Sequence, residues 1–126
     1  MYRQSHNKLV WGENDCYTQF VSHLDKKNKM PRPKYRNIQE AMDVYTKYDF
    51  MEEVSRHYKI ELKTIESIDK DDVLLYDNDI PCLHIALNNK YVKSICEFFG
   101  ERILPVKIFS RLNNVKVFKI IYEDVI

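Results

Sequence analysis

Apolar side chains recur at a helical spacing in the first part of the chain. Residues 14–15, Asn-Asp, are both good helix caps, and Phe20, Val21 and Leu24 then share one helical face. A lysine-rich stretch ends this pattern after residue 24. The pattern therefore predicts a helix whose first turn contains Cys16.

The same kind of start signal occurs twice more. An Asn or Asp cap followed three positions later by Glu predicts helices at about 37–47 and 49–58. The segment 28–36, between the first two helices, holds two prolines and is expected to be an extended loop. These signals place three helices before residue 59.

After residue 58 the apolar positions change from a helical to an alternating spacing, which is typical of strands. Strand-like runs are found at 59–65, 72–77, 83–88, 90–95 and 115–122. Short turns rich in Asn, Asp and Pro join the second run to the third and the third to the fourth, so we expect these strands to be antiparallel. Residues 105–112 predict one short helix. Helices followed by a strand meander predict an α+β fold in a single domain over residues 1–126.

The composition agrees with one ordinary folded domain. The chain has 126 residues, of which 44% are hydrophobic and 31% charged, a balance typical of globular proteins. A formal net charge of +1 gives no overall field for nucleic acid or an anionic membrane, so we expect neither as a partner. One local basic stretch is either a solvated loop or a contact for nucleic acid or an anionic glycan. It consists of Lys26, Lys27, Lys29, Arg32, Lys34 and Arg36.

Apolar runs and cysteine spacing argue against several other classes. No run approaches the roughly 18 apolar residues of a transmembrane helix. Residues 1–12 lack the apolar core of a signal peptide, so we expect a cytoplasmic protein. Three cysteines without a CxxC pair argue against a disulfide framework and a structural zinc site. A metal site of Cys16, Cys82 and His84 lacks paired-ligand spacing, and we expect neither metal nor cofactor.

Cys16 is the residue with the clearest potential for chemistry. A cysteine reacts as thiolate, and the free N–H groups and dipole of a helix N-terminus favour that anion and can bind an oxyanion. This position therefore suits acyl transfer, provided that a base reaches the thiol. The alternative is a small buried residue near the start of a helix.

His84 is the best candidate for that base among the four histidines. His6, His23 and His57 are interpreted as structural or surface residues, whereas His84 begins a strand. Strand alternation puts His84 on the same face as Ala86. A helix packed across that face would set Cys16 against the imidazole.

Three segments together resemble the NlpC-type cell-wall cysteine peptidases, a papain-like superfamily. They are the run WGENDC before the first helix, DDVLLYD, and HIALNNKYV. The sequence after Gly100 is most similar to small relatives of this superfamily in tailed bacteriophages, whose function is largely unassigned. The resemblance implies a papain-like fold in which N-terminal helices pack on a small antiparallel β-sheet.

The resemblance also implies residue roles. Cys16 would be the nucleophile, His84 the general base, and a third residue on the next strand would orient the imidazole. Lys93 stands at that third position, although a cation cannot accept the imidazole N–H. Substitutes for it are Ser94, Glu97 and Asn88. Trp11, Asp15 and Tyr17 are the candidate substrate-binding residues, with Tyr17 in place of a usually small residue.

Two functions follow from this resemblance. The first is a phage-encoded thiol hydrolase or amidase that cleaves peptide bonds of bacterial peptidoglycan through a Cys-His acyl-enzyme mechanism. The second is a catalytically degenerate member of the same fold that serves as a structural or interaction protein of phage tails or assembly. The expected partners are accordingly a peptidoglycan stem peptide or tail and virion proteins. The expected location is the host bacterial cytoplasm or the virion.

Overall fold

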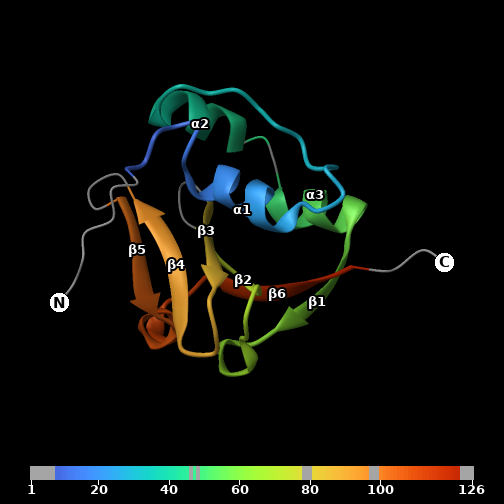
Figure 1. The fold of residues 1–126 in the computed structure, drawn as a ribbon, viewed down its shortest axis with the longest axis vertical. Coiled ribbons are helices and arrows are strands. Elements are labelled where there is room, and N and C mark those ends of the chain that lie inside the picture. Colours follow the sequence, from blue (N-terminus) through green and yellow to red (C-terminus); the bar gives the residue numbers. More distant parts are fainter. Residues whose placement is uncertain (1–7, 46, 48, 78–80, 97–99, 123–126) are drawn as a thin grey trace.

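The computed structural model of the chain describes residues 8–45, 47, 49–77, 81–96 and 100–122. Within these residues three α-helices come first, and strands with two short 3-10 helices follow (Figure 1). In chain order the elements are α1 (Cys16–Leu24), α2 (Ile38–Tyr45), α3 (Phe50–His57), β1 (Lys59–Lys63), η1 (Ile65–Ser67), β2 (Val73–Asp77), β3 (Pro81–Ala86), β4 (Tyr91–Cys96), β5 (Gly100–Pro105), η2 (Val106–Arg111) and β6 (Val115–Ile121).

The strands of the described residues form one antiparallel sheet in the order β1-β6-β2-β3-β4-β5. The last strand, β6, lies between β1 and β2, where Phe118 pairs with both Leu62 and Val73. The pairs β2-β3 and β3-β4 form the expected meander, which β5 extends by pairing with β4. The predicted α+β class, with helices followed by an antiparallel sheet, is therefore confirmed.

The sheet buries apolar side chains on both of its faces. The face packed against the helices, called here the helix face, carries Val73, Leu75 and Phe118 beneath Phe20 of α1 and Phe50 of α3. The opposite face, called the far face, has a second cluster in which η1 and η2 cover the sheet. It contains Ile68, Leu74, Ala86, Val92, Val106, Phe109 and Val117. Burial on both faces explains why the run 73–75 is continuously apolar rather than alternating.

Two details differ from the sequence prediction. The strand β5 was not predicted, because Gly100, Glu101, Arg102 and Pro105 leave its six residues with a weak alternating pattern. Its pairing with β4 over the whole of its length makes it a strand. The short helix expected at 105–112 is the 3-10 helix η2, whose Val106 and Phe109 are buried against the far face.

Candidate functional site

Asp15 is the N-cap of α1 and is almost completely buried, with 1% of its surface exposed. Its carboxylate accepts hydrogen bonds from the backbone N–H of Thr18 (2.9 Å) and of Gly12 (2.8 Å). The hydroxyl of Thr18 accepts in turn from the backbone N–H of Asp15 at 2.8 Å, which completes a capping box. The sequence analysis expected Asp15 to contact substrate, but its carboxylate hydrogen-bonds the backbone at the start of α1.

Gly12 is required by a close approach of two backbone segments. Its φ of +83° lies in the left-handed region, and a Cβ at this position would lie 2.1 Å from the carbonyl oxygen of Tyr35. Residues 10–14 form a tight turn, closed by a backbone hydrogen bond from Val10 to Asn14 at 3.0 Å. This packing gives Gly12 of the sequence motif a structural role.

Cys16 is the first residue of α1 and packs at the edge of the helix-face cluster. Burial raises the pKa of its thiol to about 12, and the neighbouring Cys82 and Asp15 act in the same direction. Backbone hydrogen bonds from Leu83 and Tyr17 act to lower the pKa but do not offset the burial. The thiol is therefore protonated at neutral pH, despite its place at a helix N-terminus.

His84 lies in β3 opposite Leu74 of β2 and is 7% exposed. Its ring packs on Phe109 of η2, with 4.9 Å between the ring centroids. Burial lowers the pKa of this imidazole to about 4. Its Nδ1 has no hydrogen-bond partner in the part of the chain that the structure describes. The ring is thus a neutral histidine within the far-face cluster.

The structure does not bring Cys16 and His84 together. Strand alternation sends Leu83 and Ile85 of β3 to the helix face, where Cys16 packs, and sends His84 to the far face with Phe109. The sequence analysis correctly put His84 on the face of Ala86, but α1 packs across the other face. The backbone of β3 consequently lies between the thiol and the imidazole.

The third position of the expected constellation is also separated from His84. Lys93 of β4 pairs with Ile85, so its side chain is on the helix face, and its Nζ lies 2.9 Å from a carboxylate oxygen of Glu101. Of the substitutes, Ser94 is buried and Asn88 accepts hydrogen bonds from two backbone N–H groups in its own turn. Glu97 lies outside the described residues.

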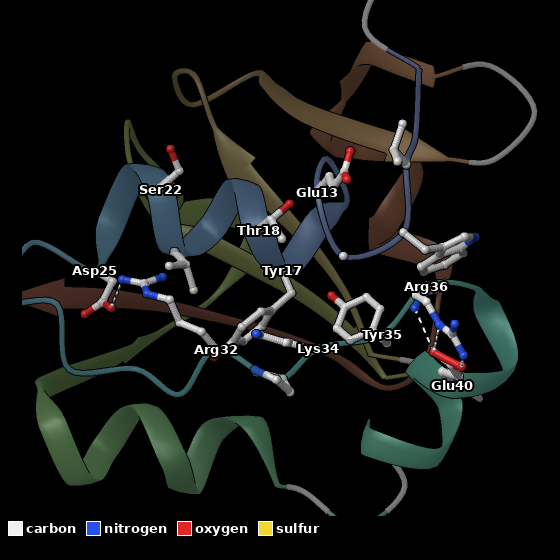
Figure 2. A pocket seen from close by; sticks show the side chains of 15 residues that line it. Glu13, Tyr17, Thr18, Ser22, Asp25, Arg32, Lys34, Tyr35, Arg36 and Glu40 are labelled. Atoms are coloured by element: carbon white, nitrogen blue, oxygen red, sulfur yellow. Dashed lines mark hydrogen bonds and ion pairs between the residues drawn. The ribbon is translucent and has the colours of Figure 1, made fainter.

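A cavity of about 940 Å³ opens between α1 and the segment 32–36, and Trp11 and Tyr17 are among its lining residues (Figure 2). Tyr17 is itself buried, and its hydroxyl donates a 2.7 Å hydrogen bond to the carbonyl oxygen of Pro31. A second cavity, of about 310 Å³, lies where His23 of α1 meets Asp71, with 2.8 Å between imidazole Nε2 and carboxylate Oδ1. Neither of these two cavities is lined by Cys16 or His84.

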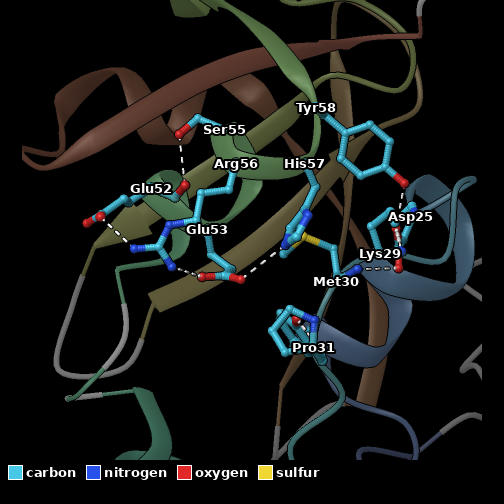
Figure 3. Close-up of polar contacts among 11 residues, drawn as sticks. Asp25, Lys29, Met30, Pro31, Glu52, Glu53, Ser55, Arg56, His57 and Tyr58 are labelled. Carbon is cyan, nitrogen blue, oxygen red and sulfur yellow. Dashed lines mark hydrogen bonds and ion pairs between the residues drawn. The ribbon is translucent and has the colours of Figure 1, made fainter.

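The end of the large cavity is anchored by the buried carboxylate of Asp25, which the sequence analysis did not single out (Figure 3). It accepts hydrogen bonds from the hydroxyl of Tyr58 and from the backbone N–H groups of Lys29 (2.9 Å) and Met30 (3.0 Å). Burial acts to raise the pKa of Asp25, but these hydrogen bonds lower it below its ordinary value. The anchor holds the segment after α1 in place.

Neither a metal site nor a membrane span is present among the described residues. No group of three His, Cys, Asp or Glu side chains there is arranged to hold a metal ion. No helix of this part of the chain has the length and apolar character needed to cross a bilayer.

Comparison of the chain with protein-family models, with curated proteins and with solved structures finds no match. The geometry of the chain itself therefore carries the functional argument.

Proposed function

We propose that this protein is a non-catalytic interaction protein built on a papain-like α+β scaffold. The observation that carries the proposal is the placement of Cys16 and His84 on opposite faces of the sheet. Nucleophilic catalysis by cysteine needs thiol and imidazole within hydrogen-bond reach. An intervening strand excludes that contact while β3 stays in the sheet.

The protonation states of the two groups support the same proposal. A reactive pair needs a thiol that gives its proton to the imidazole. Here burial raises the pKa of Cys16 to about 12 and lowers that of His84 to about 4. This order opposes transfer of the Cys16 proton to the His84 imidazole. Both groups are stable in their neutral forms.

The sequence resemblance indicates the biological setting of this proposal. Small relatives in tailed bacteriophages are the proteins that the region after Gly100 resembles most. We therefore assign the chain to the tail or assembly proteins of a phage, where it acts in the host cytoplasm or in the virion. Its proposed partners are other phage proteins rather than a peptidoglycan stem peptide.

Cysteine alkylation tests the proposal directly. The rate of iodoacetamide labelling at Cys16 is measured by peptide mass between pH 6 and pH 10, in the native chain and in guanidinium chloride. We expect native Cys16 to react at least tenfold more slowly than in the unfolded chain, because burial disfavours its thiolate. The variant His84→Ala should not change the Cys16 rate, and Cys82→Ser should leave Cys16 slow, because burial is the main cause of its raised pKa.

The hydrolase hypothesis predicts the opposite result. Fast labelling of Cys16 at neutral pH that disappears in His84→Ala would show an assembled pair. Release of peptides from purified peptidoglycan by the wild type, with none by Cys16→Ser, would establish hydrolysis and overturn the proposal.

A further inference from the structure

The large cavity is a groove between α1 and the extended segment that follows it. We call residues 31–36 the strap and the cavity the α1 groove. Thr18 and Ser22 of α1 form one wall, and Arg32 and Lys34 of the strap form the other, as Figure 2 shows. The groove opens to solvent, so a ligand can reach it from outside.

The strap presents its cations at a regular spacing. Its residues alternate in burial: Tyr35 is buried, with 4% of its surface exposed, whereas Arg32, Lys34 and Arg36 are exposed. In an extended chain, residues two apart lie on the same side and the ends of a five-residue segment are about 13 Å apart. The strap therefore offers three cations in a row over that distance.

The charges of the groove are only partly satisfied within the protein. Arg32 is held by Asp25 at 3.1 Å and Arg36 by Glu40 at 3.0 Å. No described residue forms an ion pair with the ammonium of Lys34 or with the carboxylate of Glu13, although both line the groove. A ligand that satisfies this arrangement carries a negative group for Lys34 and a positive group for Glu13.

The backbone of the strap is available as well. None of residues 32–35 makes a backbone hydrogen bond to another described residue. Pro31 and Pro33 have no N–H, and the carbonyl oxygen of Tyr35 packs against Gly12. The N–H groups of Arg32 and Lys34 are left to pair with a second extended chain, which binds as an added strand. A peptide supplies these backbone groups and charged side chains at the matching two-residue spacing.

We propose that the α1 groove binds an extended peptide segment of a partner protein, with an acidic side chain against Lys34 and a basic side chain toward Glu13. This inference rests on the proposed function, since it names the binding site of the interaction protein. Nucleic acid is disfavoured, because three lining carboxylates balance the three strap cations and leave no excess charge for phosphates.

A panel of synthetic peptides tests the inference. The peptides are fluorescein-labelled nonapeptides of alternating Thr and Val in which one position is replaced by Glu and another by Lys. The panel contains one peptide for each possible pair of positions. Binding is followed by anisotropy and by the emission of Trp11, the only tryptophan of the chain, which lines the groove. We expect a subset of the panel to bind, and Lys34→Glu to weaken that subset about tenfold.

Controls separate the groove from general charge effects. Lys29→Glu makes the same charge change at an exposed position outside the groove lining and should leave binding within twofold. Peptides with Glu and Lys exchanged should regain affinity for the double variant Lys34→Glu, Glu13→Lys. Equal effects of Lys34→Glu and Lys29→Glu, absence of binding across the panel, or stronger binding of a dT12 oligonucleotide would each overturn the inference.

These outcomes remain distinct from a failure of the proposed function. If Cys16 is unreactive and no peptide binds, the assignment of the α1 groove is wrong and the proposed function stands. Reactive Cys16 with peptidoglycan cleavage removes the proposed function, whatever the peptides do.

Discussion

Replacing His84 by Leu should change how the stability of the fold depends on pH. The imidazole is buried against Phe109, and burial lowers its pKa from 6.5 to about 4. As the pH falls from 6.5 to 4, His84 becomes protonated in the unfolded chain but stays neutral in the folded chain. The wild type therefore loses stability between pH 6.5 and pH 4, whereas His84→Leu lacks this contribution.

The size of the effect follows from the two pKa values. Proton linkage with 6.5 unfolded and about 4 folded predicts a loss of about 2 kcal/mol at pH 5 and about 3 kcal/mol at pH 4, relative to pH 8. Asp25 does not interfere, because its lowered pKa makes its contribution disappear only below the ordinary value of 3.8. At pH 8 the variant should be as stable as the wild type or slightly more stable, since the unpaired Nδ1 is removed.

Urea unfolding at pH 4, 5, 6, 7 and 8 measures this difference for wild type and His84→Leu. His57→Gln is the matched control, because it removes a histidine at the end of α3 and leaves the buried ring in place. Parallel pH profiles for wild type and His84→Leu would refute the reasoning. A wild type that gains stability over His84→Leu as the pH falls would indicate a raised imidazole pKa, as in a thiolate-imidazolium pair.

Three further substitutions test the start of α1 and the anchor of the groove. Gly12→Ala should lower the free energy of unfolding by about 2–4 kcal/mol, because the new Cβ would lie 2.1 Å from the Tyr35 carbonyl oxygen. A urea unfolding midpoint equal to that of the wild type would contradict this. Asp15→Ala should cost about 2 kcal/mol, more than removing an exposed cap, because it leaves two partly buried N–H groups without their acceptor. A loss no larger than that of the exposed cap variant D49A would contradict this. Tyr58→Phe should cost about 1–2 kcal/mol, because it removes the hydroxyl that donates to Asp25. Y91F, at an exposed tyrosine, is the control. Equal stability of the two variants would refute the role of the Tyr58 hydroxyl.

Local signals predicted most of the elements. The candidate caps Asn14 and Asp15 predicted a helix with Cys16 in its first turn, and Asp49 predicted the start of α3. Such predictions succeed because side chain and backbone groups within four residues decide where a helix starts. Alternation likewise located β2, β3, β4 and β6. The class of the fold followed from these elements.

The relation between the elements could not be predicted in the same way. Leu83 and Ile85 are apolar on one face of β3, and Ala86 is small and apolar on the other, so either face was able to receive a helix. The choice depends on the assembled sheet, in which β6, distant in sequence, pairs with β2. The groove was missed for a related reason: the basic residues of 32–36 become a wall only when the strap lies against α1.

The open sheet has a consequence for the behaviour of the protein at high concentration. In the described part of the chain β1 and β5 are the outermost strands, and each has one strongly exposed apolar side chain, Leu62 and Ile103. Charged neighbours lie next to them in sequence: Glu61 and Lys63 flank Leu62, and Arg102 precedes Ile103. Charges on edge strands discourage the addition of a strand from another molecule. Copies crowded together should therefore stay dispersed instead of joining their sheets into aggregates.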